Sequence, residues 1–280
     1  DVKPILFTIW GADIQLDDLK GWDNVKKHIE ITQKYFELEA ETVRSTFREF
    51  FIAQKLNQYI SETKENWWHG FQHGMGIIGH TAPIAYLMNV STVFIASSFT
   101  EKEKGFVTCA SDPSIDSQIR FCGIKVIHDG YECSRQQKVH FLCQFSKKTG
   151  IYPTFRVCWE SDGGKNCCAC EKCYRTIYGI VSEGEDPEKF GFTVTPEVLS
   201  EAEKKIKKWY YFDPVLVTYW TDIQNSFKEH LEIGKLYPDT QWIIKYDFSK
   251  TNKSWEKKIR NSSAGKLYKK IKRRFLKIIK

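Results

Sequence analysis

Residues 4–13 read PILFTIWGAD, and this stretch decides the fold class that the sequence predicts. Its first seven residues form a continuous apolar run, which is typical of a strand covered on both faces. Gly11 then allows a tight turn. Helical spacing follows over residues 17–39, and a second strand fits residues 41–47. A strand, a helix and a second strand form the unit from which parallel sheets are built.

The same alternation continues along the chain. Residues 61–89 begin with Ser-Glu-Thr-Lys-Glu, which is typical of a helix start. Residues 134–150 form a second predicted helix, between a serine cap and a glycine. Further strands are predicted in STVFIASS, GIKVIHDG and FRVCW, at residues 91–98, 123–130 and 155–159. The sequence therefore predicts an α/β fold with a mainly parallel, Rossmann-like sheet and helices on both faces.

The ends of the predicted strands supply the first candidate binding residues. In open α/β sheets, ligands bind at the carboxyl ends of the strands. We therefore expect a common ligand edge made by the residues that follow three of the predicted strands: Gly11, Asp13, Ser97, Ser98 and Asp129.

The chain changes character after about residue 195. A capped helix is predicted in TPEVLSEAEKKIKKW, and aromatic residues then mix with short helical patterns over residues 209–250. We expect an α/β domain over residues 1–192, a helical C-terminal region over residues 193–264 and a basic tail over residues 265–280.

The positive charge of the chain is concentrated in that tail. The net charge is +7, from 42 Lys and Arg against 35 Asp and Glu. Residues 265–280 hold eight of the basic residues and no acid, so the rest carries 34 − 35 = −1. A body this close to neutral has no global nucleic-acid signature, and any attraction to a polyanion is expected in the tail.

The cysteine pattern indicates a reducing compartment. Nine cysteines are present, five of them between residues 158 and 173, which does not suit a secreted disulfide framework. No apolar run is long enough for a membrane span, and the start does not resemble a signal peptide. The sequence predicts a cytoplasmic protein without a transmembrane segment.

The clustered cysteines have the spacing of a metal site. Cys158, Cys167, Cys170 and Cys173 follow a C-x8-C-x2-C-x2-C pattern, with Cys168 left over. Thiolates two residues apart can turn toward one ion, and an upstream cysteine completes a tetrahedron. The pattern predicts one structural zinc ion, without an open position for catalysis.

Two other interpretations of these cysteines are possible from the sequence. The C-x2-C-x2-C run also begins an iron–sulfur motif, but the further cysteine followed by proline that such a run needs is missing. Buried thiols without a metal are the plainest alternative, and the regular spacing argues against them.

The order of these features resembles a known family. A strand ends in Gly-x-Asp, a later strand ends in Ser-Ser, and the cysteine loop leads into Tyr-Arg-Thr at residues 174–176. Over residues 4–192 the chain resembles the PP-loop ATP pyrophosphatases. Within that superfamily it looks closest to the branch that contains cyano-deazaguanine synthase and relatives linked with surface-polysaccharide genes.

The resemblance implies a reaction and a role for the metal. It implies ATP and Mg²⁺ as cofactors, adenylylation of a carboxylate or amide-type substrate, and displacement of AMP by a nitrogen nucleophile. The product would belong to modified-nucleobase or surface-saccharide chemistry. It also implies a structural zinc on the four cysteines, and a nucleotide base and ribose near Gly11 and Asp13.

The chain departs from the family at one defining motif. The phosphate loop Ser-Gly-Gly-x-Asp-Ser does not occur in the sequence. We expect it upstream of Asp1, with ILFTIW as the second strand of the family. A degenerate, non-catalytic zinc module that binds a nucleotide or a protein partner is the alternative.

Three histidines lie in WWHGFQHGMGIIGH. His69 and His73 share a helical face, and His73 with its neighbour Gly74 is a candidate ligand contact. The motif lacks the glutamate of a zinc protease. A helix with hydrogen-bonded histidines is the plainer interpretation.

Four further residues are candidates for binding phosphate or substrate. Asp112 and Asp116 lie in a loop of small residues, and Arg135 and Lys138 lie at a helix start, where cations and backbone amides can hold an anion. Arg175, two residues after the last cysteine, is a fifth candidate. Each is also compatible with plain solvent exposure, and the sequence assigns no general base.

The tail repeats apolar residues near helical spacing with cations between them. It fits an interfacial helix on anionic lipid, a contact with RNA, or a solvated terminal helix. A small-molecule substrate is expected, and a homo-oligomer is left open.

Overall fold

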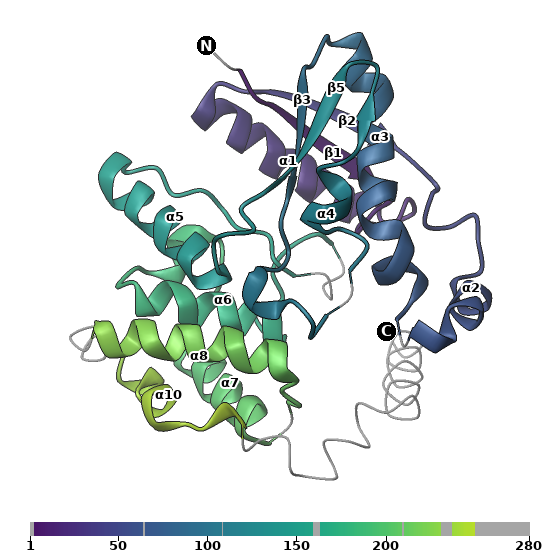
Figure 1. The fold of residues 1–280 in the computed structure, drawn as a ribbon. Helices are drawn as coiled ribbons and strands as arrows, with labels where there is room; N and C mark the ends of the chain where they lie inside the picture. The colour runs from purple at the N-terminus through teal and green to yellow at the C-terminus, as the bar shows by residue number, and fades with distance from the viewer. Residues whose placement is uncertain are drawn as a thin grey trace. The chain divides into compact units, whose positions relative to one another are not determined.

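The computed structural model describes residues 3–63, 65–107, 109–158, 163–208, 210–230 and 237–249. It consists of two compact units, Asp1–Cys167 and Cys168–Lys280, which are described separately below (Figure 1). The boundary lies inside the cysteine stretch, whereas the sequence predicted a change of domain after residue 192. The predicted basic tail at residues 265–280 lies outside the described residues.

The first unit opens with a parallel strand pair. β1 (Ile5–Trp10) pairs in parallel with β2 (Glu39–Arg44), and α1 (Leu19–Phe36) connects them. The strand–helix–strand unit predicted from residues 4–47 is therefore present, with β2 beginning two residues earlier than predicted. The residues of β1 are all half-buried rather than fully covered.

A second sheet follows in the same unit. β3 (Thr92–Ala96) pairs in parallel with β5 (Ile124–Asp129), and the short β4 (Arg120–Phe121) pairs antiparallel with β5. The α/β class is confirmed. The single, mainly parallel Rossmann-like sheet is not, because the described strands form two small sheets.

The segment between β2 and β3 is less regular than the predicted helix over residues 61–89. Its elements are α2 (Ala53–Tyr59), η1 (Ser61–Thr63), a π-helical turn η2 (Trp68–Gln72) and α3 (His73–Leu87). α3 packs against both β1 and β3. Glycines and Pro83 weaken a continuous helix, and the π turn changes the direction of the histidines at its ends.

Two short helices and one well-capped helix complete the first unit. η3 (Glu101–Glu103) and α4 (Pro113–Asp116) precede β4. α5 (Arg135–Thr149) starts at Ser134, whose hydroxyl accepts a hydrogen bond from the Gln137 N–H, and ends at Gly150 with φ +72°. Both predicted caps of this helix are confirmed.

The strand predicted at residues 155–159 is wrong for its described part, residues 155–158, which is irregular. The side chain of Asn166 takes the place of a partner strand. Its Oδ1 accepts the N–H groups of Val157 and Cys158 at 3.1 and 3.4 Å, and its Nδ2 donates to the Phe155 carbonyl at 2.6 Å. The backbone polar groups are thus satisfied without a ladder.

The second unit is helical, as the sequence predicted for the C-terminal region. Its elements are α6 (Glu171–Ser182), η4 (Pro187–Phe190), α7 (Pro196–Lys208), α8 (Pro214–Glu229), η5 (Pro238–Thr240) and α10 (Trp242–Lys245). Among the described residues, none of the helices of either unit combines the length and the apolar character needed to cross a membrane.

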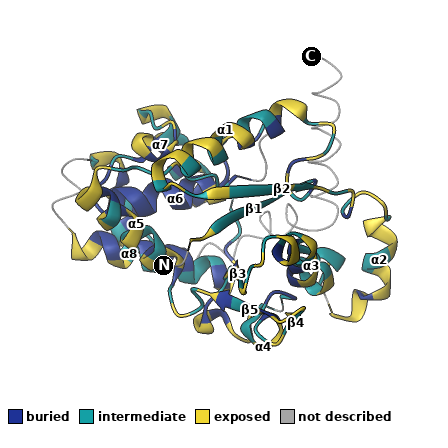
Figure 2. Cartoon of the chain, turned by 90° about the horizontal axis from the view of Figure 1, so that it is seen from above, coloured by how far each residue is buried: buried dark blue, intermediate teal, exposed yellow. Residues whose placement is uncertain are grey.

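α6 is the central helix of the second unit. Figure 2 draws it in dark blue, and every residue from Cys173 to Ser182 is buried. Tyr178 contacts Trp220 of α8 with 5.8 Å between ring centroids, and Trp220 stacks on Phe248 at 5.3 Å. Burial of each large side chain contributes about 1.5–3 kcal/mol, so this aromatic core holds α6 and α8 together.

Candidate functional site

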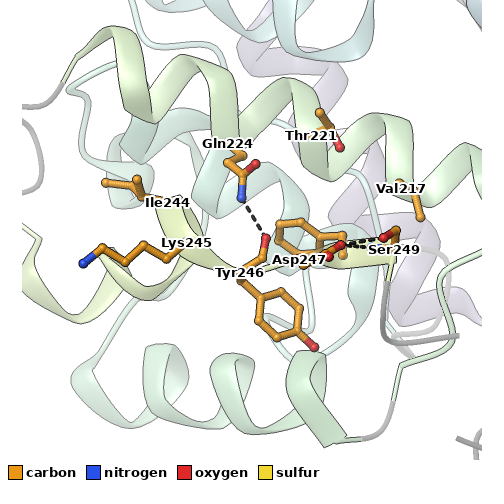
Figure 3. Close-up of a pocket in the computed structure, with 9 residues that line it drawn as sticks. Val217, Thr221, Gln224, Ile244, Lys245, Tyr246, Asp247 and Ser249 are labelled. Atoms are coloured by element: carbon orange, nitrogen blue, oxygen red, sulfur yellow. Dashed lines mark hydrogen bonds between the residues drawn. The ribbon is translucent and has the colours of Figure 1, made fainter. Parts of the chain in front are cut away.

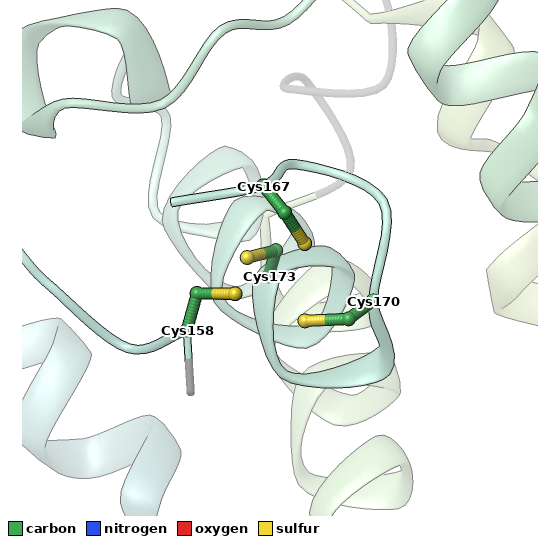
Figure 4. A group of neighbouring side chains, drawn as sticks. All are labelled: Cys158, Cys167, Cys170 and Cys173. Carbon is green, nitrogen blue, oxygen red and sulfur yellow. The ribbon is translucent and has the colours of Figure 1, made fainter. Parts of the chain in front are cut away.

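The four cysteines with metal-site spacing lie together. The sulfur atoms of Cys158, Cys167, Cys170 and Cys173 are all within 4.8 Å of one another, and Figure 4 shows them directed toward a common point. A tetrahedral ion with bonds of about 2.3 Å needs sulfurs about 3.8 Å apart. Cys158 and Cys173 are at most 1% exposed. The cluster can therefore hold one metal ion such as zinc.

The loop before Cys167 is tied to the start of α1. The Asn24 amide donates to the Gly163 carbonyl at 2.7 Å, and the Gly163 N–H donates to the Asp18 carboxylate at 3.2 Å. Gly164 has φ +69°, and a Cβ there would lie 2.6 Å from the Gly21 carbonyl oxygen. Only glycine allows this close approach, which returns the loop toward Asn166 and Cys167.

The other two ligand positions belong to the start of α6. Cys170 is the N-cap residue, and its side chain makes no capping hydrogen bond. Cys173 follows in the first turn. The N-terminal end of a helix carries partial positive charge, which stabilises thiolates and so favours metal binding.

Cys168 is set apart from the four. Its backbone has φ +48°, and its sulfur accepts the Thr193 N–H at 3.2 Å. The left-handed conformation lets Cys167 and Cys170 belong to the cluster while the intervening thiol has another partner. This agrees with the sequence prediction, which left Cys168 out.

Four predicted binding residues meet beside the carboxyl ends of β3 and β5. The Lys138 ammonium donates to the Ser97 carbonyl at 3.1 Å, and the Arg135 guanidinium donates to the Ser98 carbonyl at 3.3 Å. The Ser97 N–H donates to the Asp129 carbonyl at 2.8 Å. We call Ser97, Ser98, Arg135 and Lys138 the edge cluster.

The electrostatics of the edge cluster favour an anion. Burial lowers the pKa of Lys138, and the positive charge of Arg135 lowers it further. Cys133, Glu132 and Asp129 raise the pKa of Lys138 but do not offset these two effects, and a bound anion would raise that pKa further. The N-terminal end of α5, a helix of 15 residues, adds partial positive charge at the same place.

The predicted carboxylates Asp112 and Asp116 serve local structure. Asp112 is the N-cap of α4 and accepts the Ser114 N–H at 2.9 Å. Asp116 is fully buried and accepts hydrogen bonds from the Ser111 hydroxyl at 2.7 Å and the His128 ring at 2.8 Å. The sequence analysis did not single out His128, whose place on β5 is the residue before Asp129.

The remaining sheet-edge candidates make other contacts. Gly11 turns the chain at the end of β1 with φ +105°. Asp13 pairs with Arg156 at 3.8 Å. In the second unit, Arg175 lies 3.5 Å from the Glu171 carboxylate, with its guanidinium 4.6 Å from the centre of the Tyr219 ring. The structure thus brings together four of the predicted binding residues and gives these three separate partners.

His73, the last predicted binding residue, contacts a cysteine. Its Nδ1 lies 3.4 Å from the Cys109 sulfur, and its ring meets the edge of Trp68. His69 pairs with Glu65 through Nδ1 at 2.9 Å. The sequence indicated only the spacing of the two histidines. Cys109 lies 36 residues after His73, so its contact with that ring could not be predicted from neighbouring residues.

Gly74 allows the start of α3 to approach the loop after Cys109. A Cβ at Gly74 would lie 2.6 Å from Asp116 Oδ1, 2.8 Å from the Ala110 carbonyl oxygen and 3.0 Å from Ser111 Cα. Two of these atoms are backbone and cannot shift cheaply. The helix and the loop therefore need glycine at this position.

The Gly74→Ala variant is expected to lose about 2 kcal/mol of unfolding free energy, because the added methyl forces α3 and the loop apart. Gly79→Ala on the same helix is the matched control, since a Cβ there meets nothing within 4 Å. It should be neutral or gain up to about 1 kcal/mol. Urea unfolding followed by circular dichroism measures both, and equal values would contradict this account of Gly74.

The second unit has a shallow pocket between α8 and residues 244–249. It encloses about 280 Å³. Figure 3 shows that the Gln224 amide lies across it and donates to the Tyr246 carbonyl, at 2.8 Å. Asp247 is engaged by the Ser249 N–H and hydroxyl at 3.0 and 2.5 Å. The polar groups of the pocket thus hold residues 246–249 in place rather than form a cluster of reactive side chains.

Comparison with known proteins leaves the family open. No family model matches the chain, and no curated protein or solved structure matches it either.

Proposed function

We propose that this chain is a zinc-stabilised, nucleotide-binding α/β enzyme that activates a carboxylate or amide-type substrate by adenylylation, after which a nitrogen nucleophile displaces AMP. The edge cluster is the observation that carries the proposal. Two cations, Arg135 and Lys138, lie beside the carboxyl ends of two parallel strands and at a helix start. Phosphate groups bind at such places in open α/β sheets.

The roles of the two cations differ in geometry. The Arg135 guanidinium is planar and can donate two parallel hydrogen bonds to phosphate oxygens, whereas Lys138 supplies a compact point charge. Together they offset the charge that develops on a leaving pyrophosphate when a carboxylate oxygen bonds to the α-phosphorus of ATP. The bond from that phosphorus to the bridging oxygen breaks, and the pyrophosphate keeps its electron pair.

The metal in this proposal is zinc, and its role is structural. Four thiolates in a compact group suit a tetrahedral ion without redox chemistry. With all four positions filled by sulfur, no site remains for a water or a substrate. The metal would stabilise the loop before Cys167 and the start of α6.

Charge removal at the edge cluster is expected to weaken nucleotide binding. Arg135→Gln and Lys138→Gln should each raise the dissociation constant for Mg·ATP about tenfold or more, since a charge-assisted hydrogen bond contributes roughly 1.5–3 kcal/mol. Lys148→Gln is the matched control, because Lys148 is exposed and lies at the opposite end of α5.

Isothermal titration calorimetry on the full chain measures these constants. Unchanged affinity in both variants, or no ATP binding by the unmodified protein, would contradict the proposal. Pyrophosphate release in the presence of ATP and candidate carboxylates then tests the adenylylation step.

A non-catalytic nucleotide- or protein-binding module is the second candidate. The observation in its favour is the group of four cysteines, which suits a structural metal and needs no catalytic site. Such a module would bind ATP with the same dependence on Arg135 and Lys138 but release no pyrophosphate with any acceptor. The two readouts therefore separate the candidates.

A further inference from the structure

Cys109 lies among two imidazoles and a carboxylate in the first unit. The His73 Nδ1 is 3.4 Å from the Cys109 sulfur. The His69 ring lies near enough to the Cys109 thiol for the two groups to shift each other's pKa. The other side of that ring is held by Glu65, whose Oε2 is 2.9 Å from His69 Nδ1. The order carboxylate, imidazole, thiol is the arrangement that activates a cysteine for nucleophilic attack.

The imidazoles favour the charged form of the thiol. Burial raises the pKa of Cys109, but hydrogen bonds from His69, His73 and the Ser111 N–H outweigh it and lower that pKa to about 6. The bond with Cys109 raises the pKa of His69 to about 9, with Glu65 adding to the rise and burial opposing it. Between these values the pair exists as thiolate and imidazolium.

The backbone that follows Cys109 packs closely against neighbouring elements. The Ala110 N–H donates to the His69 carbonyl at 2.8 Å, which ties the segment after Cys109 to the π turn. Gly74 allows the contact of α3 with residues 110–111. Behind the loop, the charged or titratable groups are Asp116 and His128, which hydrogen-bond each other at 2.8 Å. These contacts position the backbone on the C-terminal side of Cys109.

His69 contacts a residue next to the edge cluster. Its ring meets the edge of Phe99, with 5.8 Å between centroids. Phe99 directly follows Ser97 and Ser98, whose carbonyls hold Lys138 and Arg135. One short segment, residues 97–99, therefore connects the thiol with the two cations.

We propose that Cys109 is a nucleophile for an activated acyl carbon, with His69 as its proton acceptor and Glu65 as the residue that positions His69. The substrate class is a carboxylate carried as an ester, a thioester or an acyl phosphate. The choice of an acyl adenylate as the natural acyl donor rests on the proposed function. The assignment of Cys109 as a nucleophile does not depend on that function.

The chemical step is a transfer without oxidation or reduction. The thiolate sulfur forms a bond to the carbonyl carbon, and the bond from that carbon to the leaving oxygen breaks. The leaving group departs with the electron pair and takes the proton that His69 holds. The product is a thioester on Cys109, which an amine or water then cleaves.

Acylation with p-nitrophenyl acetate tests the proposal on the full chain without ATP. We expect a burst of p-nitrophenol of one equivalent per chain and an acetyl group mapped to Cys109 by peptide mass spectrometry. Cys109→Ser should abolish the burst, whereas Cys122→Ser should leave it unchanged, because Cys122 is an exposed thiol outside this group of side chains. Acetylation of other residues with none on Cys109 would overturn the proposal.

The pH dependence of alkylation distinguishes an activated cysteine from an accessible cysteine of ordinary reactivity. With iodoacetamide, the rate at Cys109 should rise through an inflection near pH 6, against about 8.5 for an ordinary cysteine. His69→Gln should slow acylation at pH 7 by roughly 100-fold and move the inflection upward. Glu65→Gln should give a smaller change in the same direction.

The readouts also separate this proposal from the nucleotide site. If the alkylation rate of Cys109 had its inflection near pH 8.5 and His69→Gln did not change the acylation rate, Cys109 would not be the proposed nucleophile. The proposal of ATP binding would be unaffected. If the unmodified protein bound no ATP but gave a normal acetylation burst, the proposed function would be wrong and the assignment of Cys109 would be supported. Circular dichroism of each variant checks that the fold is retained.

Discussion

Replacing Cys173 with serine is expected to abolish metal binding and to lower the free energy of unfolding by on the order of 5 kcal/mol. Cys173 is completely buried in the first turn of α6, the helix on which the aromatic core of the second unit is built. A serine hydroxyl is a poor ligand for a soft metal ion, and three like-charged thiolates would remain close together. The helix start would then lose its anchor.

Thermal and denaturant unfolding, each with and without a strong chelator, measures this effect. The unmodified protein should lose stability with the chelator, and Cys173→Ser should show no further loss. Cys168→Ser and Cys122→Ser are the matched controls, since one thiol adjoins the cluster and the other is exposed. If Cys168→Ser lost the metal as completely as Cys173→Ser, the assignment of the four ligands would be wrong.

Gly11→Ala is expected to destabilise the first unit by about 3 kcal/mol or more. Gly11 has φ +105°, a conformation that side chains rarely adopt, and a Cβ there would lie 1.9 Å from the Ser45 carbonyl oxygen. That oxygen belongs to the residue directly after β2, whose N–H donates to the Trp10 carbonyl at 2.9 Å. The clash therefore falls on the pairing of β1 with β2.

Gly150→Ala separates strain from steric clash. Gly150 also has a positive φ, +72°, but a Cβ there meets nothing within 4 Å. It should lose only about 1 kcal/mol, the cost of a left-handed residue. The excess loss at Gly11, read from urea midpoints, is the contribution of the contact with Ser45. Equal losses at the two glycines would contradict the close approach.

Features with a local cause could be predicted from the sequence. The caps of α5, Ser134 and Gly150, act within one turn of the helix, so their residue types sufficed. The edge cluster could be predicted as well, because the carboxyl ends of β3 and β5 and the start of α5 follow from the strand–helix alternation. The cysteine cluster was recognisable because its four positions lie within sixteen residues of sequence.

Features that depend on distant partners were missed. Residues 155–158 have the composition of a strand, but the Asn166 side chain satisfies their backbone from across a loop. An aspartate can bind a ligand or cap a helix with the same carboxylate, so the residue type of Asp112 did not show that it caps α4. Nothing in the sequence indicated that the two parallel pairs would lie in separate sheets.

The Cys109 site shows the same limit most clearly. The sequence placed His69 and His73 on one helical face, whereas His69 lies within a π turn that ends just before His73. Glu65 pairs with His69, and Cys109 contacts His73. Cys109 reaches them only because Gly74 lets a loop pack against the start of α3. That contact is tertiary, and no spacing along the chain reveals it.

Elemental analysis of the purified full chain shows whether the four cysteines hold a zinc ion. We expect one zinc ion per chain, lost when Cys173 is replaced by serine and retained when Cys168 is replaced, with no absorption in the visible range. A brown protein with stoichiometric iron, or a chain that binds no metal at all, would contradict it.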